Sequence, residues 1–138
     1  MSTDCFIPEA DPLTDLARDN FGIPYIFPYQ RLVISNILEA AGVPGFAPEE
    51  EINPVTRERE IRDTRPNQIV ILPTGAGKSL CFMLPAFLLD GPTLVVFPLL
   101  SLIADQARRL EEAGMKPGIL RGGQPKAERE AVFQDALS

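Results

Sequence analysis

The spacing of apolar residues predicts two helices in the first part of the chain. Apolar side chains recur every three or four positions over residues 13–21, directly after Asp11-Pro12, a pair suited to the start of a helix. The same spacing returns over residues 29–41, and a glycine follows each stretch as a helix stop. Two prolines within residues 23–28 argue against regular structure there. Residues 1–41 are therefore expected to form an N-terminal helical segment.

The pattern of apolar residues changes at residue 68. Short, continuously apolar and largely β-branched runs suit strands that are covered on both faces, and apolar residues at helical spacing follow each run. The expected strands are 68–72, 93–97 and 118–120, and the expected helices are 78–89, 101–113 and 125–137. Strands that alternate with helices predict an α/β fold with a parallel sheet.

Residues 42–67 separate these two parts. Prolines, glycines and charged side chains dominate this stretch, so few of its residues can enter a core. A polar insertion or loop is the favoured interpretation. Its arginines suggest a small basic patch as the alternative, but the interleaved acidic residues weaken that case.

Composition narrows the functional classes. A length of 138 residues predicts one domain, and the absence of histidine removes the commonest general base and metal ligand. Two cysteines are too few for a zinc site or a disulfide framework. The longest apolar run, residues 80–89, is far shorter than the ~20 residues of a membrane span, and the N-terminus has no signal-peptide pattern. A cytoplasmic protein with no membrane partner is expected.

The net charge of −6 is unevenly spread. Residues 1–66 contain 12 acidic and 6 basic residues, whereas residues 67–138 contain 7 of each. An acidic chain is unsuited to binding nucleic acid by bulk electrostatic attraction. Any nucleic-acid contact must therefore be local.

A glycine-rich loop lies between the first expected strand and its helix. Gly75 and Gly77 allow the backbone to turn so that successive N–H groups face phosphate oxygens, and the following helix adds its positive dipole end. Lys78 would contact the β- and γ-phosphates, and the Ser79 hydroxyl would ligate Mg²⁺.

The loop fits only the second half of the usual phosphate-loop pattern, because its first glycine would fall at Leu72. An ordinary turn with a chance lysine is the alternative. The expected strand before the loop, the helix after it and the run Thr74-Gly75-Ala76-Gly77-Lys78-Ser79 disfavour that alternative. The sequence thus predicts binding of a nucleoside triphosphate.

Three stretches resemble motifs of the RecQ family of superfamily 2 DNA helicases. Residues 72–86 are similar to motif I, and residues 95–106 to motif Ia, which lies on the single-stranded DNA side of the domain. Phe21-Gly22 followed by Phe27-Pro28-Tyr29-Gln30 resembles motif 0. The resemblance covers about residues 13–41 and 68–138.

This resemblance implies a RecA-like lobe that binds ATP and Mg²⁺, with Lys78 as a catalytic residue. It implies that the Gln30 amide contacts adenine, and that Pro98 and Ser101 contact DNA, single-stranded or forked. Ser101 is also expected to cap its helix. Phe27 stands where the family has an arginine. Either Phe27 stacks on the base or it packs in the core, and the sequence leaves both open.

A motor of this superfamily also needs an Asp-Glu pair and a second lobe, and no Asp-Glu dipeptide occurs in the sequence. The chain is therefore expected to represent the N-terminal part of a first lobe, 68–138 being a partial ATP-binding domain that does not hydrolyse ATP efficiently alone. The alternatives are another P-loop NTPase or kinase, or a non-catalytic nucleotide-binding remnant.

Overall fold

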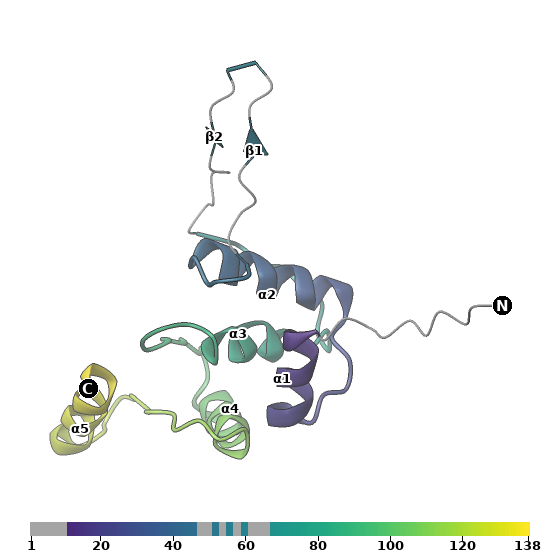
Figure 1. The fold of residues 1–138 in the computed structure, drawn as a ribbon. Helices are drawn as coiled ribbons and strands as arrows, with labels where there is room; N and C mark the ends of the chain where they lie inside the picture. The colour runs from purple at the N-terminus through teal and green to yellow at the C-terminus, as the bar shows by residue number, and fades with distance from the viewer. Residues whose placement is uncertain (1–10, 47–50, 53–54, 57–58, 61–66) are drawn as a thin grey trace.

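The structure is a computed structural model that describes residues 11–46, 51–52, 55–56, 59–60 and 67–138. Figure 1 shows the order of its elements along the chain. The helices are α1 (Pro12–Phe21), α2 (Pro28–Ala40), α3 (Lys78–Ala86), α4 (Leu100–Glu112) and α5 (Lys126–Leu137), and the strands are β1 (Glu51–Ile52) and β2 (Arg59–Glu60). Among these described residues, no helix is both long enough and apolar enough to cross a membrane.

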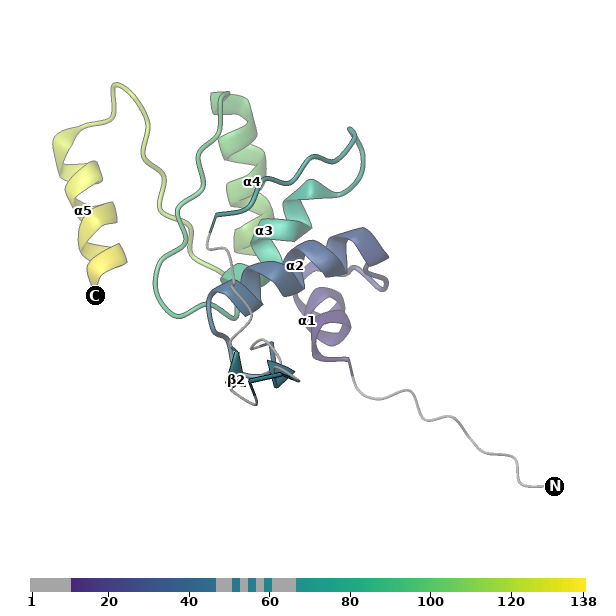
Figure 2. The same cartoon turned by 90° about the horizontal axis from the view of Figure 1, so that it is seen from above.

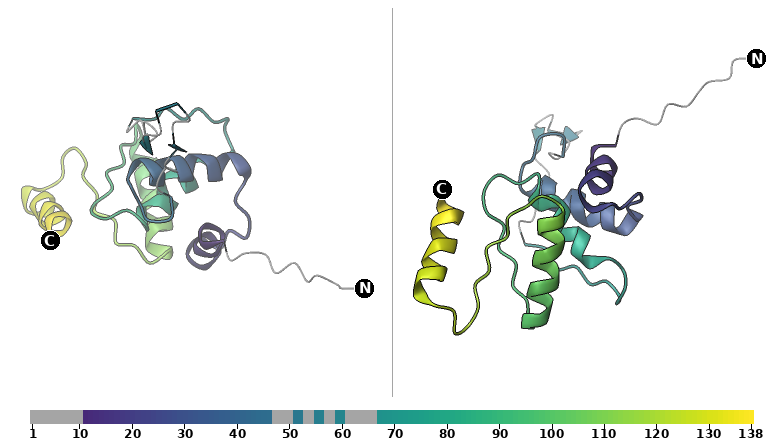
Figure 3. Two further views of the ribbon diagram at one scale, coloured as in Figure 1. Left: turned by 45° about the horizontal axis from the view of Figure 1, so that its top comes forward. Right: turned by 90° about the horizontal axis from the view of Figure 1, so that it is seen from below.

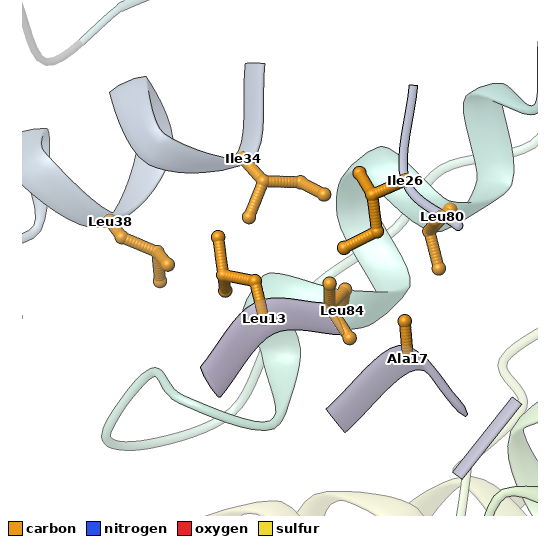
Figure 4. Close-up of a cluster of buried hydrophobic side chains, with 7 residues drawn as sticks. All are labelled: Leu13, Ala17, Ile26, Ile34, Leu38, Leu80 and Leu84. Atoms are coloured by element: carbon orange, nitrogen blue, oxygen red, sulfur yellow. The ribbon is translucent and has the colours of Figure 1, made fainter. Parts of the chain in front are cut away.

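The main core lies where α1, α2 and α3 meet (Figure 4). Seven apolar side chains from these helices and the α1–α2 connection are buried together: Leu13, Ala17, Ile26, Ile34, Leu38, Leu80 and Leu84. Full burial of such aliphatic side chains contributes about 1.5–3 kcal/mol each. The helix that follows the glycine-rich loop is therefore held in place by the N-terminal helical segment.

The helices expected at 13–21 and 29–41 are confirmed to within one residue. Each begins with a proline, whose missing N–H would have no partner in a first turn. Gly22, at a φ of 65°, ends α1: its N–H donates to the Arg18 carbonyl, and the N–H of Ile23 donates to the Ala17 carbonyl. Local start and stop signals thus determine both helices.

Asp11 precedes α1 but does not cap it through its side chain. Its carboxylate instead accepts hydrogen bonds from Arg31 on α2, one of them 2.9 Å long, and from the Thr14 hydroxyl. The Arg31 guanidinium is the main cause that lowers the pKa of Asp11 from 3.8 to about 2. This ion pair joins α1 to α2.

The buried parallel sheet expected from the sequence is not formed by the described residues. Residues 68–72, 93–97 and 118–120 belong to no strand, and Figure 2 draws these segments as connecting loops. Ile69 is 91% exposed and Leu94 is 84% exposed. The reason is that a parallel strand gains its hydrogen bonds only from neighbouring strands, which in wound sheets often come from distant parts of a chain.

The strands that the described residues do form lie inside the predicted polar insertion. β1 and β2 pair antiparallel, with Glu51 opposite Glu60 and Ile52 opposite Arg59. Much of the 42–67 stretch lies outside the described residues, so its role as an insertion stays a prediction.

The C-terminal half contains three helices at nearly the expected places. α3 ends three residues earlier than expected, and residues 87–91 form turns after the buried Pro85. α4 matches the expected helix 101–113 to within one residue. α5 lies apart from the core in both views of Figure 3 and has no buried residue.

Candidate nucleotide-binding site

The glycine-rich loop leads directly into α3, as the sequence predicts. The Ala76 N–H donates to the Pro73 carbonyl at 3.2 Å and closes the first turn of the loop. Gly75 and Gly77 have φ values of 81° and 73°, which residues with a Cβ rarely adopt. Gly77 is the residue from which α3 begins.

The start of α3 presents backbone donors that have no acceptor among the described residues. In the part of the chain that the structure describes, the N–H groups of Gly77, Lys78 and Ser79 donate to no protein group. They sit at the positive end of the helix dipole, where an anion is favoured. The Lys78 side chain is exposed and that of Ser79 is partly exposed. These features match a phosphate cradle.

Two side chains of α2 hold the carbonyl side of the same peptides. The Tyr29 hydroxyl donates to the Ala76 carbonyl at 2.9 Å. The Gln30 Nε2 donates to the Gly77 carbonyl at 3.1 Å and to the Ala76 carbonyl at 3.4 Å. In a planar trans peptide the C=O and the following N–H point in opposite directions. Because α2 holds these carbonyls, the N–H groups of Gly77 and Lys78 point away from α2.

Gln30 is 4% exposed, and its whole amide is engaged. Its Oε1 accepts the N–H of Phe27 at 2.9 Å, while its Nε2 bonds the loop. The contact with adenine expected for Gln30 stays a prediction. The glycine at 77 is the one sequence signal that is consistent with this packing, because a Cβ there would overlap the Gln30 Nε2.

Phe27 does not pack in the core, so that alternative is wrong. Its side chain is 50% exposed. Its ring stacks on that of Tyr29, with centroids 5.5 Å apart and planes 3° from parallel. Tyr25 meets Phe27 edge-on at 5.4 Å. An exposed aromatic cluster therefore borders the glycine-rich loop, and sequence reasoning considered only one of its three members.

The residues expected at the DNA side lie at the start of α4. Pro98 and Ser101 are both exposed. Ser101 does not cap the helix, contrary to expectation, because α4 begins at Leu100 and its N-cap is Leu99. DNA contact by Pro98 and Ser101 stays a prediction. A cavity of about 370 Å³ adjoins this helix, lined by Leu100, Ile103, Ala104, Ile119, Arg121 and Gln124.

The start of α3 offers backbone N–H donors, the Lys78 ammonium and the Ser79 hydroxyl. Burial raises the pKa of the Cys81 thiol on α3, which keeps it protonated and poorly nucleophilic. No cluster of three acidic or thiol side chains suited to a metal occurs among the described residues. A Mg²⁺ ion at Ser79 fits this donor set only with phosphate oxygens and water as its other ligands, which is its usual environment beside nucleotides.

Comparison with known proteins identifies the family of this chain. Residues 27–136 match the DEAD/DEAH box helicase family. The chain is 41% identical over 70 residues to an ATP-dependent DNA helicase RecQ of Bacillus subtilis, a match that covers 51% of this chain and 12% of that protein. It is 30% identical over 131 residues to a putative ATP-dependent DNA helicase Q1 of Caenorhabditis elegans, covering 95% of this chain and 17% of the relative.

A third relative, the putative ATP-dependent DNA helicase Q1 of Caenorhabditis briggsae, is 46% identical over 71 residues, 51% of this chain and 12% of its own length. The chain thus spans less than a fifth of these relatives. No solved structure matches it significantly. The family match runs from the aromatic segment before α2 to the last helix and covers most of the sequence. The chain therefore belongs to the DEAD/DEAH box helicase family, and its RecQ-like character is confirmed.

Proposed function

We propose that this chain forms the ATP-binding part of an ATP-dependent DNA helicase, which couples ATP hydrolysis to the separation of DNA strands. One observation carries the proposal: α2 holds the carbonyls of Ala76 and Gly77, which turns the N–H groups of Gly77 and Lys78 away from α2 at the start of α3. The relatives named above are described as ATP-dependent DNA helicases. These names support DNA as the partner and ATP as the nucleotide.

In this proposal the loop Thr74–Ser79 wraps the triphosphate. The N–H groups of Gly77, Lys78 and Ser79 bind phosphate oxygens, and the Lys78 ammonium neutralises charge at the β- and γ-phosphates. The Ser79 hydroxyl holds Mg²⁺, which would balance the charge that develops during phosphoryl transfer. Because that transfer depends on positioning and charge stabilisation, these residues act by fixing the phosphates in place.

The DNA side of the proposal rests on α4 and the residues before it. Pro98 and Ser101 are exposed at its start, where hydroxyl and backbone groups can contact phosphate oxygens. The half of the chain that contains them carries no net charge, unlike the acidic first half. We therefore place single-stranded DNA along this end of α4.

Calorimetric titration of the chain with ATP and Mg²⁺ tests the nucleotide part. Lys78→Ala removes a charged hydrogen bond to phosphate and should weaken ATP binding about 10- to 100-fold. Lys126→Ala is the matched control, because this lysine is exposed on α5, outside the loop. Equal ATP affinity of the Lys78→Ala variant and the unchanged chain would contradict the proposal.

Fluorescence anisotropy with a labelled single-stranded oligonucleotide tests the DNA part. Ser101→Glu places a negative charge at the proposed phosphate contact and should weaken DNA binding while leaving ATP binding unchanged. A Ser101→Glu variant that binds the oligonucleotide as well as the unchanged chain would remove α4 from the DNA interface. The kinase alternative predicts no DNA binding in either case.

A further inference from the structure

Three side chains at the starts of α1 and α2 form a closed hydrogen-bond network. Asp11 lies directly before α1, Thr14 lies in its first turn, and Arg31 lies in the first turn of α2. Both terminal nitrogens of the Arg31 guanidinium donate to the Asp11 carboxylate, Nη1 at 2.9 Å, and Nη2 also donates to the Thr14 hydroxyl at 2.9 Å. The Thr14 hydroxyl in turn donates to Asp11. Pairing at two points fixes direction as well as distance. We call these three residues the α1–α2 network.

The network lies beside the residues that hold the glycine-rich loop. Tyr29 and Gln30 immediately precede Arg31 and donate to two carbonyls of the loop. One turn of helix therefore contacts α1 through Arg31 and the loop through its two neighbours. The N-cap of α2 is Phe27, whose side chain has no oxygen that could accept an N–H of this turn. Contacts with other elements therefore contribute more to fixing the turn.

α1 also contacts the helix on the far side of the loop. Leu13 and Ala17 of α1 are buried together with Leu80 and Leu84 of α3, the helix that the loop leads into (Figure 4). α1 is thus hydrogen-bonded to the helix that holds the loop carbonyls and packed on the helix that begins at the loop. The network therefore fixes the start of α2 relative to the start of α3.

We propose that Asp11, Thr14 and Arg31 are positioning residues for the triphosphate of the bound nucleotide. They hold the first turn of α2 at the place from which Tyr29 and Gln30 orient the glycine-rich loop. This inference rests on the proposed function and adds to it residues that act on the loop through α2, without contacting a phosphate.

Positioning by the network and direct phosphate binding by Arg31 predict effects of opposite sign. If Arg31 bound phosphate, Asp11 would compete with the phosphate for the guanidinium, and Asp11→Asn would strengthen the binding of a triphosphate. Removal of a negative charge also favours an anion through simple Coulomb attraction. If the network positions α2, Asp11→Asn weakens binding although the chain becomes less acidic. The sign of the effect therefore separates the two roles.

Calorimetric titration with ATP and with inorganic tripolyphosphate, each with Mg²⁺, measures this sign. Because both side chains of the pair are more than a third exposed, Asp11→Asn and Arg31→Ala should each weaken binding by only about two- to fivefold. The factor should be the same for both ligands, since the network acts on the loop. The double variant should bind as well as either single variant, because the same pair is lost in all three. Asp15→Asn is the matched control: it removes the same charge, but its partner Arg18 lies on α1 as well.

A second background tests the route through α2. In a chain with Tyr29→Phe and Gln30→Ala the side-chain bonds to the loop are absent, so Asp11→Asn should no longer change the affinity for tripolyphosphate. NMR spectra of the isotope-labelled chain without ligand give an independent measurement. Asp11→Asn should shift the backbone amide signals of residues 75–78, and Asp15→Asn should leave them in place.

The outcomes separate this proposal from the proposed function. Unchanged or stronger triphosphate binding in Asp11→Asn, or an equal loss in Asp15→Asn, would overturn the network as a positioning device while leaving nucleotide binding intact. A loss that persists undiminished in the Tyr29→Phe, Gln30→Ala background would also overturn it, because the effect would then bypass α2. If the unchanged chain binds neither ATP nor tripolyphosphate, the proposed function itself is wrong and the positioning role falls with it. Loop amide signals that do not move in Asp11→Asn would overturn the positioning role whether or not a ligand binds.

Discussion

Replacement of Gly77 by alanine gives the sharpest test of how α2 holds the phosphate loop. Gly77 has a φ of 73°, and an alanine Cβ at this position would overlap Nε2 of Gln30. Gln30 is 4% exposed and bonded on both sides, so any movement of its amide breaks these hydrogen bonds. Gly77→Ala must therefore displace the amide from the loop.

Gly75→Ala is the matched control for backbone strain. Gly75 has a similar φ of 81°, but nothing lies within 4 Å of a Cβ placed there. Both substitutions should lose about 1–2 kcal/mol, because a residue with a Cβ is strained in the left-handed region. Gly77→Ala should lose about 2 kcal/mol more, corresponding to two well-formed hydrogen bonds of Gln30 at about 1 kcal/mol each.

Thermal unfolding followed by circular dichroism measures this difference. For a chain of this size, 1 kcal/mol corresponds to about 4 °C, so the Gly77→Ala midpoint should lie about 8 °C below that of Gly75→Ala. In a Gln30→Ala background the difference between the two alanine variants should vanish, because nothing remains to be displaced. Equal midpoints for Gly75→Ala and Gly77→Ala in the unchanged background would refute the role of Gln30 in holding the loop.

Two further predictions concern the helical core that carries the loop. Leu84→Ala opens a cavity among fully buried side chains and should cost about 2–5 kcal/mol in urea unfolding, while Leu137→Ala, 84% exposed, should change stability by less than about 0.5 kcal/mol. Asp11→Asn should lose about 1 kcal/mol near neutral pH, a small value because both partners of the Asp11–Arg31 pair are more than a third exposed. The pair lowers the pKa of Asp11 from 3.8 to about 2, so its contribution is complete above pH 3.8 and disappears as the pH falls toward about 2. Chemical unfolding of both chains across this range should therefore converge at the acid end, and a constant difference would contradict the assignment to Asp11.

The sequence predicted helices far better than strands, and the physical reason is the range of the interactions. Helices at 13–21, 29–41 and 101–113 were placed to within one residue, because each helical hydrogen bond closes over four residues. The apolar runs at 68–72 and 93–97 indicate burial, but a strand also needs a partner that the run itself does not specify. Membership of the helicase family implies a P-loop fold of RecA type, whose sheet the described residues do not form.

The candidate site was predicted only in part, because some of its contacts join residues that are far apart in the sequence. The loop at 74–79 was found because its glycines, lysine and serine are adjacent in the sequence. The hydrogen bonds from Tyr29 and Gln30 to this loop join residues 46 or 47 positions apart, and the spacing of apolar residues does not predict such bonds. For Phe27 the sequence left open whether it stacks on the base or packs in the core, and its 50% exposure excludes only the core.

The glycine-rich loop is held mainly by α2. Its geometry is therefore determined by this helix rather than by a strand before the loop. Tyr29 and Gln30 bond its carbonyls, and the Gln68 side chain before the loop donates to the Asn36 carbonyl of α2 at 2.9 Å. Below the loop, α3 packs on α2 through the buried core. The preceding segment contributes no strand pairing among the described residues. The N–H groups proposed to bind phosphate are therefore oriented by a helix whose start carries the exposed rings of Phe27 and Tyr29. A shift of α2 would thus move the glycine-rich loop with it, because Tyr29 and Gln30 bond the loop carbonyls directly.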